Sequence, residues 1–195
     1  MRTELTGDTA TMHKFSPGRS EKLENPDRYQ FLPPAKTLVT LGLKRGMTMA
    51  DIGAGTGFFA RAASEIVGSQ GRVYAVDMSA EMLDQLKQRG LPPNVTPVLS
   101  KEYTIPLEDH SVDFSFLAFV VHETERTSHF LEEVKRITRK GGRVAIVEWK
   151  KQVEEHGPPE EERIGREELI ERLSDFPIAA SGNLNSSHYF VLLQI

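Results

Sequence analysis

Three glycines at alternate positions follow an acidic residue in the first third of the chain. The string is Asp51-Ile52-Gly53-Ala54-Gly55-Thr56-Gly57. Glycine is preferred where the backbone must take a positive φ or approach a ligand closely. Apolar residues precede Asp51 and a helical pattern begins at Phe58, which indicates a buried strand, a turn and a helix start. Such a turn is where an α/β sheet binds a nucleotide-like ligand, although a plain Gly-rich connection has the same appearance.

The spacing of the glycines limits the kind of ligand. The dinucleotide fingerprint is G-x-G-x-x-G, and here Phe58 takes the place of its third glycine. The chain has no G-x-x-x-x-G-K-[ST] string, so a nucleoside-triphosphate loop is excluded. Asp77 ends the next expected strand, twenty positions after Gly57. An acid at about this separation reaches ribose hydroxyls, whereas its alternative role is to cap the following helix, as Ser79 could also do.

The glycine string resembles the first motif of class I S-adenosylmethionine-dependent methyltransferases. The string Glu-Val-x-Arg-x-x-x-x-Gly-Gly at residues 133–142 resembles a sequence of their type 11, UbiE-like group. The resemblance implies S-adenosylmethionine as the cofactor, with the glycine turn under its methionine part. It implies these cofactor-binding residues: Asp51, Gly53, Ala54, Gly55, Thr56, Gly57, Asp77, Met78, Glu102, Tyr103 and Phe119.

The adenine position departs from the family pattern. In the family an Asp a few residues before a Leu-Pro pair accepts the adenine amino group, but Lys101 stands at that place and the acid is Glu102. Either Glu102 takes the adenine role with a shifted loop, or backbone groups do so and Glu102 is a solvated surface acid. Tyr103 is a candidate to pack beside the base.

His122 is the candidate catalytic residue. It follows the expected fourth strand, residues 112–119, whose carboxyl end faces the transferred methyl group in the family. A pKa near 6.5 suits a general base, although a structural histidine at a helix end is an equal alternative. We expect no metal site, because the adjacent residues His122 and Glu123 do not converge on one ion and no H-x-x-x-H spacing is present.

The acceptor is expected to be a small molecule. The chain lacks the Pro-Pro-aromatic loop of DNA amino-methyltransferases, and its net charge of −4 gives no reason to expect nucleic acid. The absence of cysteine excludes disulfides and a Cys nucleophile, and it disfavours a thiolate-based arsenic enzyme. Two alternatives are a nicotinamide-dependent oxidoreductase and a non-catalytic cofactor-binding protein. The oligomeric state, monomer or homodimer, is left open.

The pattern of elements predicts an α/β, Rossmann-like, doubly wound sheet of seven strands. Helical and strand patterns alternate as far as residue 149. The helix with apolar positions at Phe130, Leu131, Val134 and Ile137 is expected to end at Gly141–Gly142. Two closing strands at residues 178–182 and 189–194 have no helix between them, which predicts a hairpin with one antiparallel strand. A nicotinamide-binding unit would instead continue with β-α-β units.

Two segments are expected along the chain. Residues 1–33 are polar but carry scattered rings, including Phe15, Tyr29 and Phe31, so we expect an N-terminal lid or tail. Residues 34–195 are expected to form a single methyltransferase domain, since 38% of the 195 residues are hydrophobic. No window approaches 18 apolar residues, so we expect no membrane span and a cytoplasmic protein.

Overall fold

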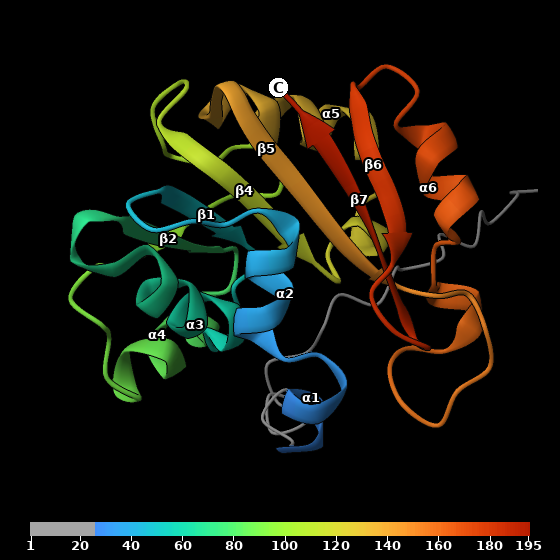
Figure 1. The fold of residues 1–195 in the computed structure, drawn as a ribbon, viewed down its shortest axis with the longest axis horizontal. Helices are drawn as coiled ribbons and strands as arrows, with labels where there is room; N and C mark the ends of the chain where they lie inside the picture. The colour runs from blue at the N-terminus through green and yellow to red at the C-terminus, as the bar shows by residue number, and fades with distance from the viewer. Residues whose placement is uncertain (1–25) are drawn as a thin grey trace, which may run out of the picture.

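Strands and helices alternate along residues 26–195, the part of the chain that the computed structural model describes (Figure 1). The strands in this part form one seven-stranded sheet and are β1 Thr48–Ile52, β2 Arg72–Asp77, β3 Val95–Leu99, β4 Val112–Ala118, β5 Thr138–Trp149, β6 Ile178–Asn183 and β7 His188–Gln194. The helices are α1 Pro26–Phe31, α2 Pro34–Leu41, α3 Phe58–Val67, α4 Ala80–Gln88, α5 Thr127–Ile137 and α6 Arg166–Arg172, with 3-10 turns η2 Gly68–Gln70, η3 Val121–Glu123 and η4 Glu160–Glu162.

The strand order is β3-β2-β1-β4-β5-β7-β6. Strands β1 to β5 pair in parallel, and β7 is antiparallel to both of its neighbours. The predicted doubly wound sheet with one antiparallel strand is therefore confirmed. The chain starts in the middle at β1, runs outward to β3 and returns to β4, so the strand order reverses between β1 and β4. Ligands of open α/β sheets bind outside the carboxyl ends of the strands at such a reversal.

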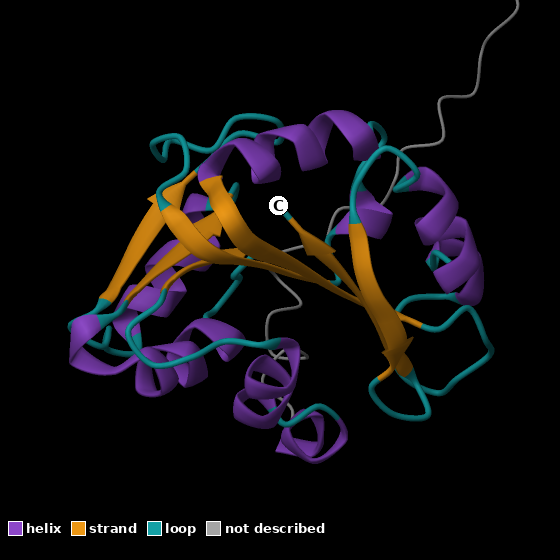
Figure 2. Ribbon diagram, turned by 45° about the horizontal axis from the view of Figure 1, so that its top comes forward, coloured by secondary structure: helices purple, strands orange, loops and turns teal. Residues whose placement is uncertain are grey.

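Helices cover both faces of the sheet (Figure 2). Phe59 of α3 and Leu86 of α4 belong to one buried apolar cluster, while Val134 of α5 and Leu169 of α6 belong to the other. Each fully buried side chain of this kind stabilises the fold by roughly 1.5–3 kcal/mol. Burial on both faces explains why the parallel strands are nearly continuous in apolar residues.

The boundary between α5 and β5 differs from the expected one. The helix ends at Ile137, and the strand begins directly at Thr138 instead of after Gly141–Gly142. The Thr138 hydroxyl donates to the Val134 carbonyl at 2.7 Å and closes the last turn. Arg139 thus lies in the strand, where it pairs with Asp113 at 2.7 Å. The two glycines allow a bulge, because a Cβ at Gly142 would lie 2.9 Å from the Asp113 carbonyl oxygen.

The expected N-terminal lid lies largely outside the described residues, and only its last part can be placed. Helix α1 is followed by Leu32, which is buried in the same apolar cluster as residues of α2 and α3. The Tyr29 ring lies 4.7 Å from the Phe58 ring at the start of α3, and the Phe31 carbonyl accepts a hydrogen bond from the Asn185 amide at 2.6 Å. No helix in residues 26–195 has the length and apolar character to cross a membrane.

Candidate active site

The glycine turn has the geometry that its sequence predicts. Gly53, Gly55 and Gly57 have φ values of 74°, 53° and 91°, in the left-handed region that side chains rarely adopt. The backbone N–H groups of Gly53 and Ala54 donate to the Val76 carbonyl at 2.8 and 3.0 Å, which ties the turn to β2. Gly53 is exposed to solvent, so bare backbone forms the surface at the end of β1.

The turn also lies against the segment that follows β4. A Cβ added at Gly53 would collide with a methyl group of Val120, two residues before His122. The glycine turn and the predicted catalytic segment are therefore in direct contact at the reversal of strand order.

Asp77 ends β2 and joins two loops. Its Oδ2 accepts the Gly55 N–H at 2.8 Å, and its Oδ1 accepts the Ser79 N–H at 2.8 Å. Burial raises the pKa of the Asp77 carboxyl above its usual value, although the hydrogen bonds from Ser79 and Gly55 act in the opposite direction. The carboxylate faces the glycine turn and has about four acceptor positions. Ser79 caps α4 through its own hydroxyl, which accepts the Met82 N–H at 3.2 Å.

The other residues expected around the turn differ in their exposure. Asp51, Ala54 and Thr56 are buried, so their side chains support the turn from within. Met78 is 44% exposed directly after Asp77, where an apolar surface is open to a planar ligand. These residues stay predicted cofactor contacts.

Glu102 and Tyr103 form the tip of a tight turn after β3. The backbone groups of Lys101 and Thr104 pair across it at 3.0 and 3.3 Å. A hydrogen bond with Glu102 raises the pKa of the Tyr103 hydroxyl. The Tyr103 ring lies 5.1 Å from the His129 ring, and the Arg126 guanidinium lies 5.7 Å from its centre. The turn is thus ordered at the strand end where an adenine-binding residue is expected.

A salt bridge in α5 holds the segment that follows this turn. Arg136 contacts Glu133 through two nitrogens at 2.7 and 2.8 Å, which lowers the pKa of the Glu133 carboxyl. Glu133 accepts the Ile105 N–H at 2.6 Å, and Arg136 donates to the Ile105 and Leu107 carbonyls at 2.8 and 2.9 Å. The Glu-Val-x-Arg string therefore clamps both backbone groups of Ile105.

His122 lies in η3, at the end of β4, and pairs with a buried carboxylate. Its Nδ1 is 2.8 Å from Glu148 Oε2, and Glu148 is only 1% exposed. The other oxygen of Glu148 accepts the N–H groups of Val121 and His122 at 2.9 and 3.2 Å. The imidazole and the backbone that carries it are thus oriented by one side chain of the neighbouring strand β5.

The environment of His122 changes its basicity. Burial lowers the pKa of the imidazole, but the charge and the hydrogen bond of Glu148 outweigh this effect, so the pKa of His122 lies above its ordinary value of 6.5. An ionised carboxylate only accepts hydrogen bonds, so Nδ1 donates and Nε2 keeps its lone pair in the neutral ring. The Glu123 carboxylate lies 4.0 Å from Nε2, which is longer than a hydrogen bond.

Aromatic rings border this region on the opposite face of β5. Phe119 follows β4 with a φ of 63°, and its ring lies 5.4 Å from Trp149 and 5.3 Å from His188. Trp149 and His188 are 4.2 Å apart on the paired strands β5 and β7. The expected fourth strand thus ends one residue early, at Ala118, and the turn at Phe119 directs its ring toward this cluster.

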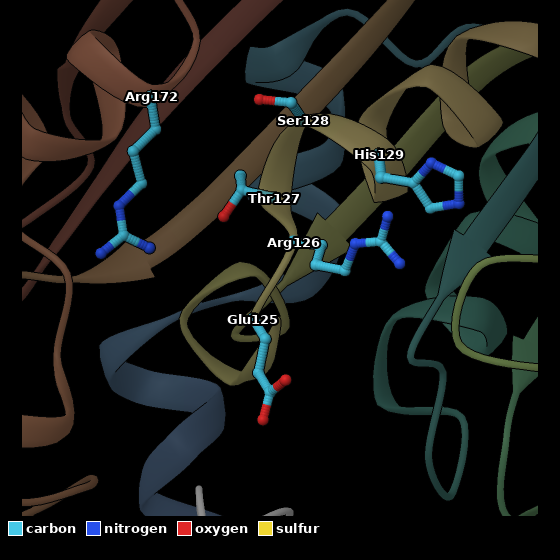
Figure 3. A pocket seen from close by; sticks show the side chains of 6 residues that line it. All are labelled: Glu125, Arg126, Thr127, Ser128, His129 and Arg172. Carbon is cyan, nitrogen blue, oxygen red and sulfur yellow. The ribbon is translucent and has the colours of Figure 1, made fainter.

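A cavity of about 510 Å³ lies elsewhere, at the start of α5 (Figure 3). Arg126 and His129 extend to one side in Figure 3, while Arg172 reaches in from α6 on the other side. The lining contains neither His122 nor a residue of the glycine turn. Within residues 26–195, no three His, Cys, Asp or Glu side chains form a group that could hold a metal ion.

Glu148 is the main site residue that sequence reasoning missed. The signal was present, because Glu148 is the single charged residue in the otherwise apolar end of β5, Val-Ala-Ile-Val-Glu-Trp. A buried carboxylate requires a partner. The structure pairs β5 with β4, which brings His122 within reach of Glu148.

The residues at the ends of β1 to β4 fit a nucleoside with an amino-acid tail. Exposed glycine backbone lies at the end of β1. A carboxylate that can accept hydrogen bonds from hydroxyl groups lies at the end of β2, and an acid next to an aromatic residue follows β3. This donor and acceptor set matches S-adenosylmethionine. A Cβ at Gly53 or Gly57 would collide with Val120 or Leu86, so the turn that presents its backbone there requires glycine.

Comparisons with known proteins agree with this geometry. The family described as "Methyltransferase domain" matches residues 50–146. The chain is 33% identical to the ubiquinone/menaquinone biosynthesis C-methyltransferase UbiE of Idiomarina loihiensis over 121 residues, 60% of this chain and 48% of that protein. The UbiE of Hahella chejuensis is 31% identical over 119 residues, 59% of this chain and 48% of that protein. The chain thus spans about half the length of the UbiE proteins that it matches.

A solved structure is similar over nearly the whole chain. The S-adenosylmethionine-dependent methyltransferase of Aquifex aeolicus is 37% identical, with a TM-score of 0.88, and the match covers 92% of this chain and 98% of that one. None of these matches favours the nicotinamide alternative. The chain therefore belongs to the class I S-adenosylmethionine-dependent methyltransferases, in the type 11, UbiE-like group.

Proposed function

We propose that the chain transfers a methyl group from S-adenosylmethionine to a small-molecule acceptor, and that His122 removes the proton of that acceptor. The observation that carries the proposal is the His122–Glu148 pair, which follows β4 two residues after Val120, the residue packed against the glycine turn. A carboxylate that holds Nδ1 and leaves Nε2 as an acceptor is the arrangement that orients histidine bases in other enzymes.

The cofactor would be held by the ends of three strands. The backbone of the glycine turn would bind the amino-acid part, and Asp77 would accept the ribose hydroxyls. Met78, Glu102 and Tyr103 would surround the base, and Phe119 would lie near the reacting end. A charge-assisted hydrogen bond of the Asp77 type contributes about 1.5–3 kcal/mol, which corresponds to roughly tenfold to a hundredfold in affinity.

The protein has two tasks in the reaction. The bound cofactor supplies an electrophilic methyl group on a sulfonium, so alignment of the acceptor is worth more than activation of the methyl group. Alignment can lower the barrier by roughly 7–11 kcal/mol, and a general base adds about 10²–10⁴-fold. His122 must be neutral to act as a base. Since its pKa is raised, we expect the rate to increase with pH through that raised pKa and then level off.

The acceptor class follows from the rings beside the site. Phe119, Trp149 and His188 offer flat apolar surfaces to a planar ring. The UbiE relatives are C-methyltransferases of ubiquinone and menaquinone biosynthesis. We infer an aromatic acceptor with an acidic hydroxyl group, which loses its proton to His122 as its carbon or oxygen attacks the methyl group.

Binding and turnover test the proposal in sequence. Calorimetry with S-adenosylmethionine and with NAD, measured separately, should show binding of the first only. The protein should then convert S-adenosylmethionine to S-adenosylhomocysteine with at least one member of a set of quinols and phenols, measured by mass spectrometry. His122→Gln should keep cofactor affinity and lose turnover. Binding of the cofactor without turnover on any acceptor would instead support the non-catalytic alternative.

A further inference from the structure

Arg163 is a buried cation outside the groups that the proposed reaction uses. It follows η4, and its side chain is 1% exposed. The loop at residues 150–162, orange at the lower right of Figure 1, connects β5 to this arginine. An isolated charge costs several kcal/mol to bury unless its hydrogen-bonding groups are satisfied.

The loop is wrapped around the Arg163 guanidinium. Four backbone carbonyls accept from it: those of Lys150 at 3.1 Å, Gln152 at 3.0 Å, His156 at 2.7 Å and Pro158 at 2.8 Å. The Glu154 carboxylate adds a fifth contact at 3.2 Å. The guanidinium is a planar group with five donors in fixed directions, so it sets the path of the loop in a way that an ammonium group cannot.

The same loop packs on Trp149. The Arg163 guanidinium carbon lies 5.0 Å from the centre of the indole ring. Gly157 has a φ of 87°, and a Cβ at this position would lie 2.9–3.0 Å from three indole carbons. The rings of His188 and Phe119 lie 4.2 and 5.4 Å from the indole. Trp149 is therefore held between the loop around Arg163 and the rings of His188 and Phe119.

The loop also reaches the N-terminal helix. The His156 ring lies 6.3 Å from the Phe31 ring at the end of α1. Phe31 is 56% exposed, and its carbonyl is bonded to Asn185 in the β6–β7 turn. The loop, α1 and the β6–β7 turn thus form one continuous rim beside the ring cluster.

We propose that Arg163 is a positioning residue that holds the 150–162 loop closed on Trp149 and thereby sets which acceptors the site admits. The inference rests on the proposed function for the role of the ring cluster, but not for the behaviour of the loop. Loss of the guanidinium removes the hydrogen bonds of four carbonyls at once. The loop therefore opens, and the Trp149 indole loses its fixed position. The cofactor side of the site, at the ends of β1 to β3, is left unchanged.

Trp149 is the only tryptophan of the chain, so its fluorescence reports on this loop without any acceptor. The variants are Arg163→Met and Arg163→Lys, with Arg172→Met as the control, because Arg172 is 43% exposed and pairs with Glu168 of its own helix. In both Arg163 variants we expect red-shifted emission and stronger acrylamide quenching. Amides of residues 150–158 should exchange faster by at least about tenfold. The control should match the wild type.

Cofactor affinity and acceptor kinetics separate positioning from general stability. S-adenosylhomocysteine, measured by calorimetry, should bind the Arg163 variants as it binds the wild type. For an acceptor that the wild type methylates, KM should rise by at least about tenfold while kcat changes less, and the preference between two acceptors should narrow. Arg163→Lys should recover part of the loss, because it keeps the charge without the planar fork.

Gly157→Val tests the same contact if Arg163→Met does not fold. It leaves the guanidinium intact but pushes the loop off the indole, so it should give the same fluorescence change and the same rise in KM. Unchanged quenching and exchange in these variants would overturn the inference, as would equal losses of cofactor and acceptor binding. Failure of the proposed function would give a different result. The wild type would then methylate no acceptor, but the loop would still open in the variants.

Discussion

Replacing Glu148 by glutamine changes a single atom next to the proposed base and should reverse its tautomer. The glutamine oxygen can still accept the N–H groups of Val121 and His122, so the backbone of η3 keeps its position. Its NH₂ group then replaces the oxygen that is 2.8 Å from His122 Nδ1. An amide N–H can only donate there, so Nδ1 must accept and the ring proton moves to Nε2. The nitrogen that faces the acceptor is then no longer a base.

The expected loss equals the contribution of a general base. This contribution is about 10²–10⁴-fold in kcat, or roughly 3–5 kcal/mol of barrier. A serine protease in which the aspartate behind the catalytic histidine becomes asparagine loses about 10⁴-fold for the same reason, a wrong tautomer. Cofactor affinity should stay at the wild-type value, because the glycine turn and Asp77 do not contact Glu148.

Two measurements follow the tautomer and the rate separately. Long-range ¹H–¹⁵N spectra of the imidazoles, assigned by comparison with His122→Gln, should place the proton on Nδ1 in the wild type and on Nε2 in Glu148→Gln. The wild-type rate should increase with pH through the raised pKa of His122, and the rate of the variant should lack this increase. Glu123→Gln is the control, since its carboxylate is 4.0 Å from Nε2 and its removal should change kcat by less than about fivefold.

If Glu148→Gln kept nearly the wild-type kcat and the same increase of rate with pH, the proposed role of His122 as a general base would be refuted. A reversed tautomer with unchanged kcat would show that the reaction needs no base, and the proposal would reduce to cofactor binding and alignment. An unchanged tautomer would show that the Glu148 contact does not orient the ring.

Three further changes test the cofactor side. Asp77→Asn should weaken S-adenosylmethionine binding at least about tenfold by calorimetry, whereas Asp84→Asn on the exposed face of α4 should not. Gly53→Ala combines a positive φ with a collision against Val120, so it should destabilise the fold by about 1–3 kcal/mol in thermal unfolding. Gly46 has a similar φ with open space around it, so Gly46→Ala should destabilise the fold less. Equal losses of stability in the two variants would show that the collision with Val120 does not contribute. Arg136→Met should lower Tm by several degrees, about 2–4 °C per kcal/mol, and weaken cofactor binding through the Ile105 segment, while unchanged affinity would limit the clamp to stability.

The elements that sequence predicted best are those fixed by local pattern. The glycine turn at Gly53 and the strand ending at Asp77 depend on neighbouring residues, and both have the expected geometry. The end of α5 was placed too late, because Gly141 and Gly142 were read as a helix stop. The stop is the hydroxyl of Thr138, whose partner at Ser115 lies on another strand. A threonine in sequence does not reveal a partner of this kind.

The acceptor side could not be predicted in the same way, because its contacts depend on residues far apart in the chain. His122 was found by its position after β4, but its partner Glu148 lies 26 residues later. The segment around Arg163 is acidic and Pro-rich, which is typical of a solvated connection. Only the folded chain shows that four of its carbonyls converge on one guanidinium.

The chemistry and the shape of the site both depend on the register of β5. Adjacent residues of a strand point to opposite faces, so Glu148 reaches His122 while Trp149 faces Phe119 and the loop. A shift of β5 by one residue would exchange these two side chains and remove both the Glu148 contact with His122 and the Trp149 contact with the rings. The register of β5 is fixed by six residue pairs with β4 and by seven with β7, the last of which places Trp149 opposite His188. The closing hairpin carries none of the proposed catalytic groups, yet together with β4 it determines where Glu148 and Trp149 lie.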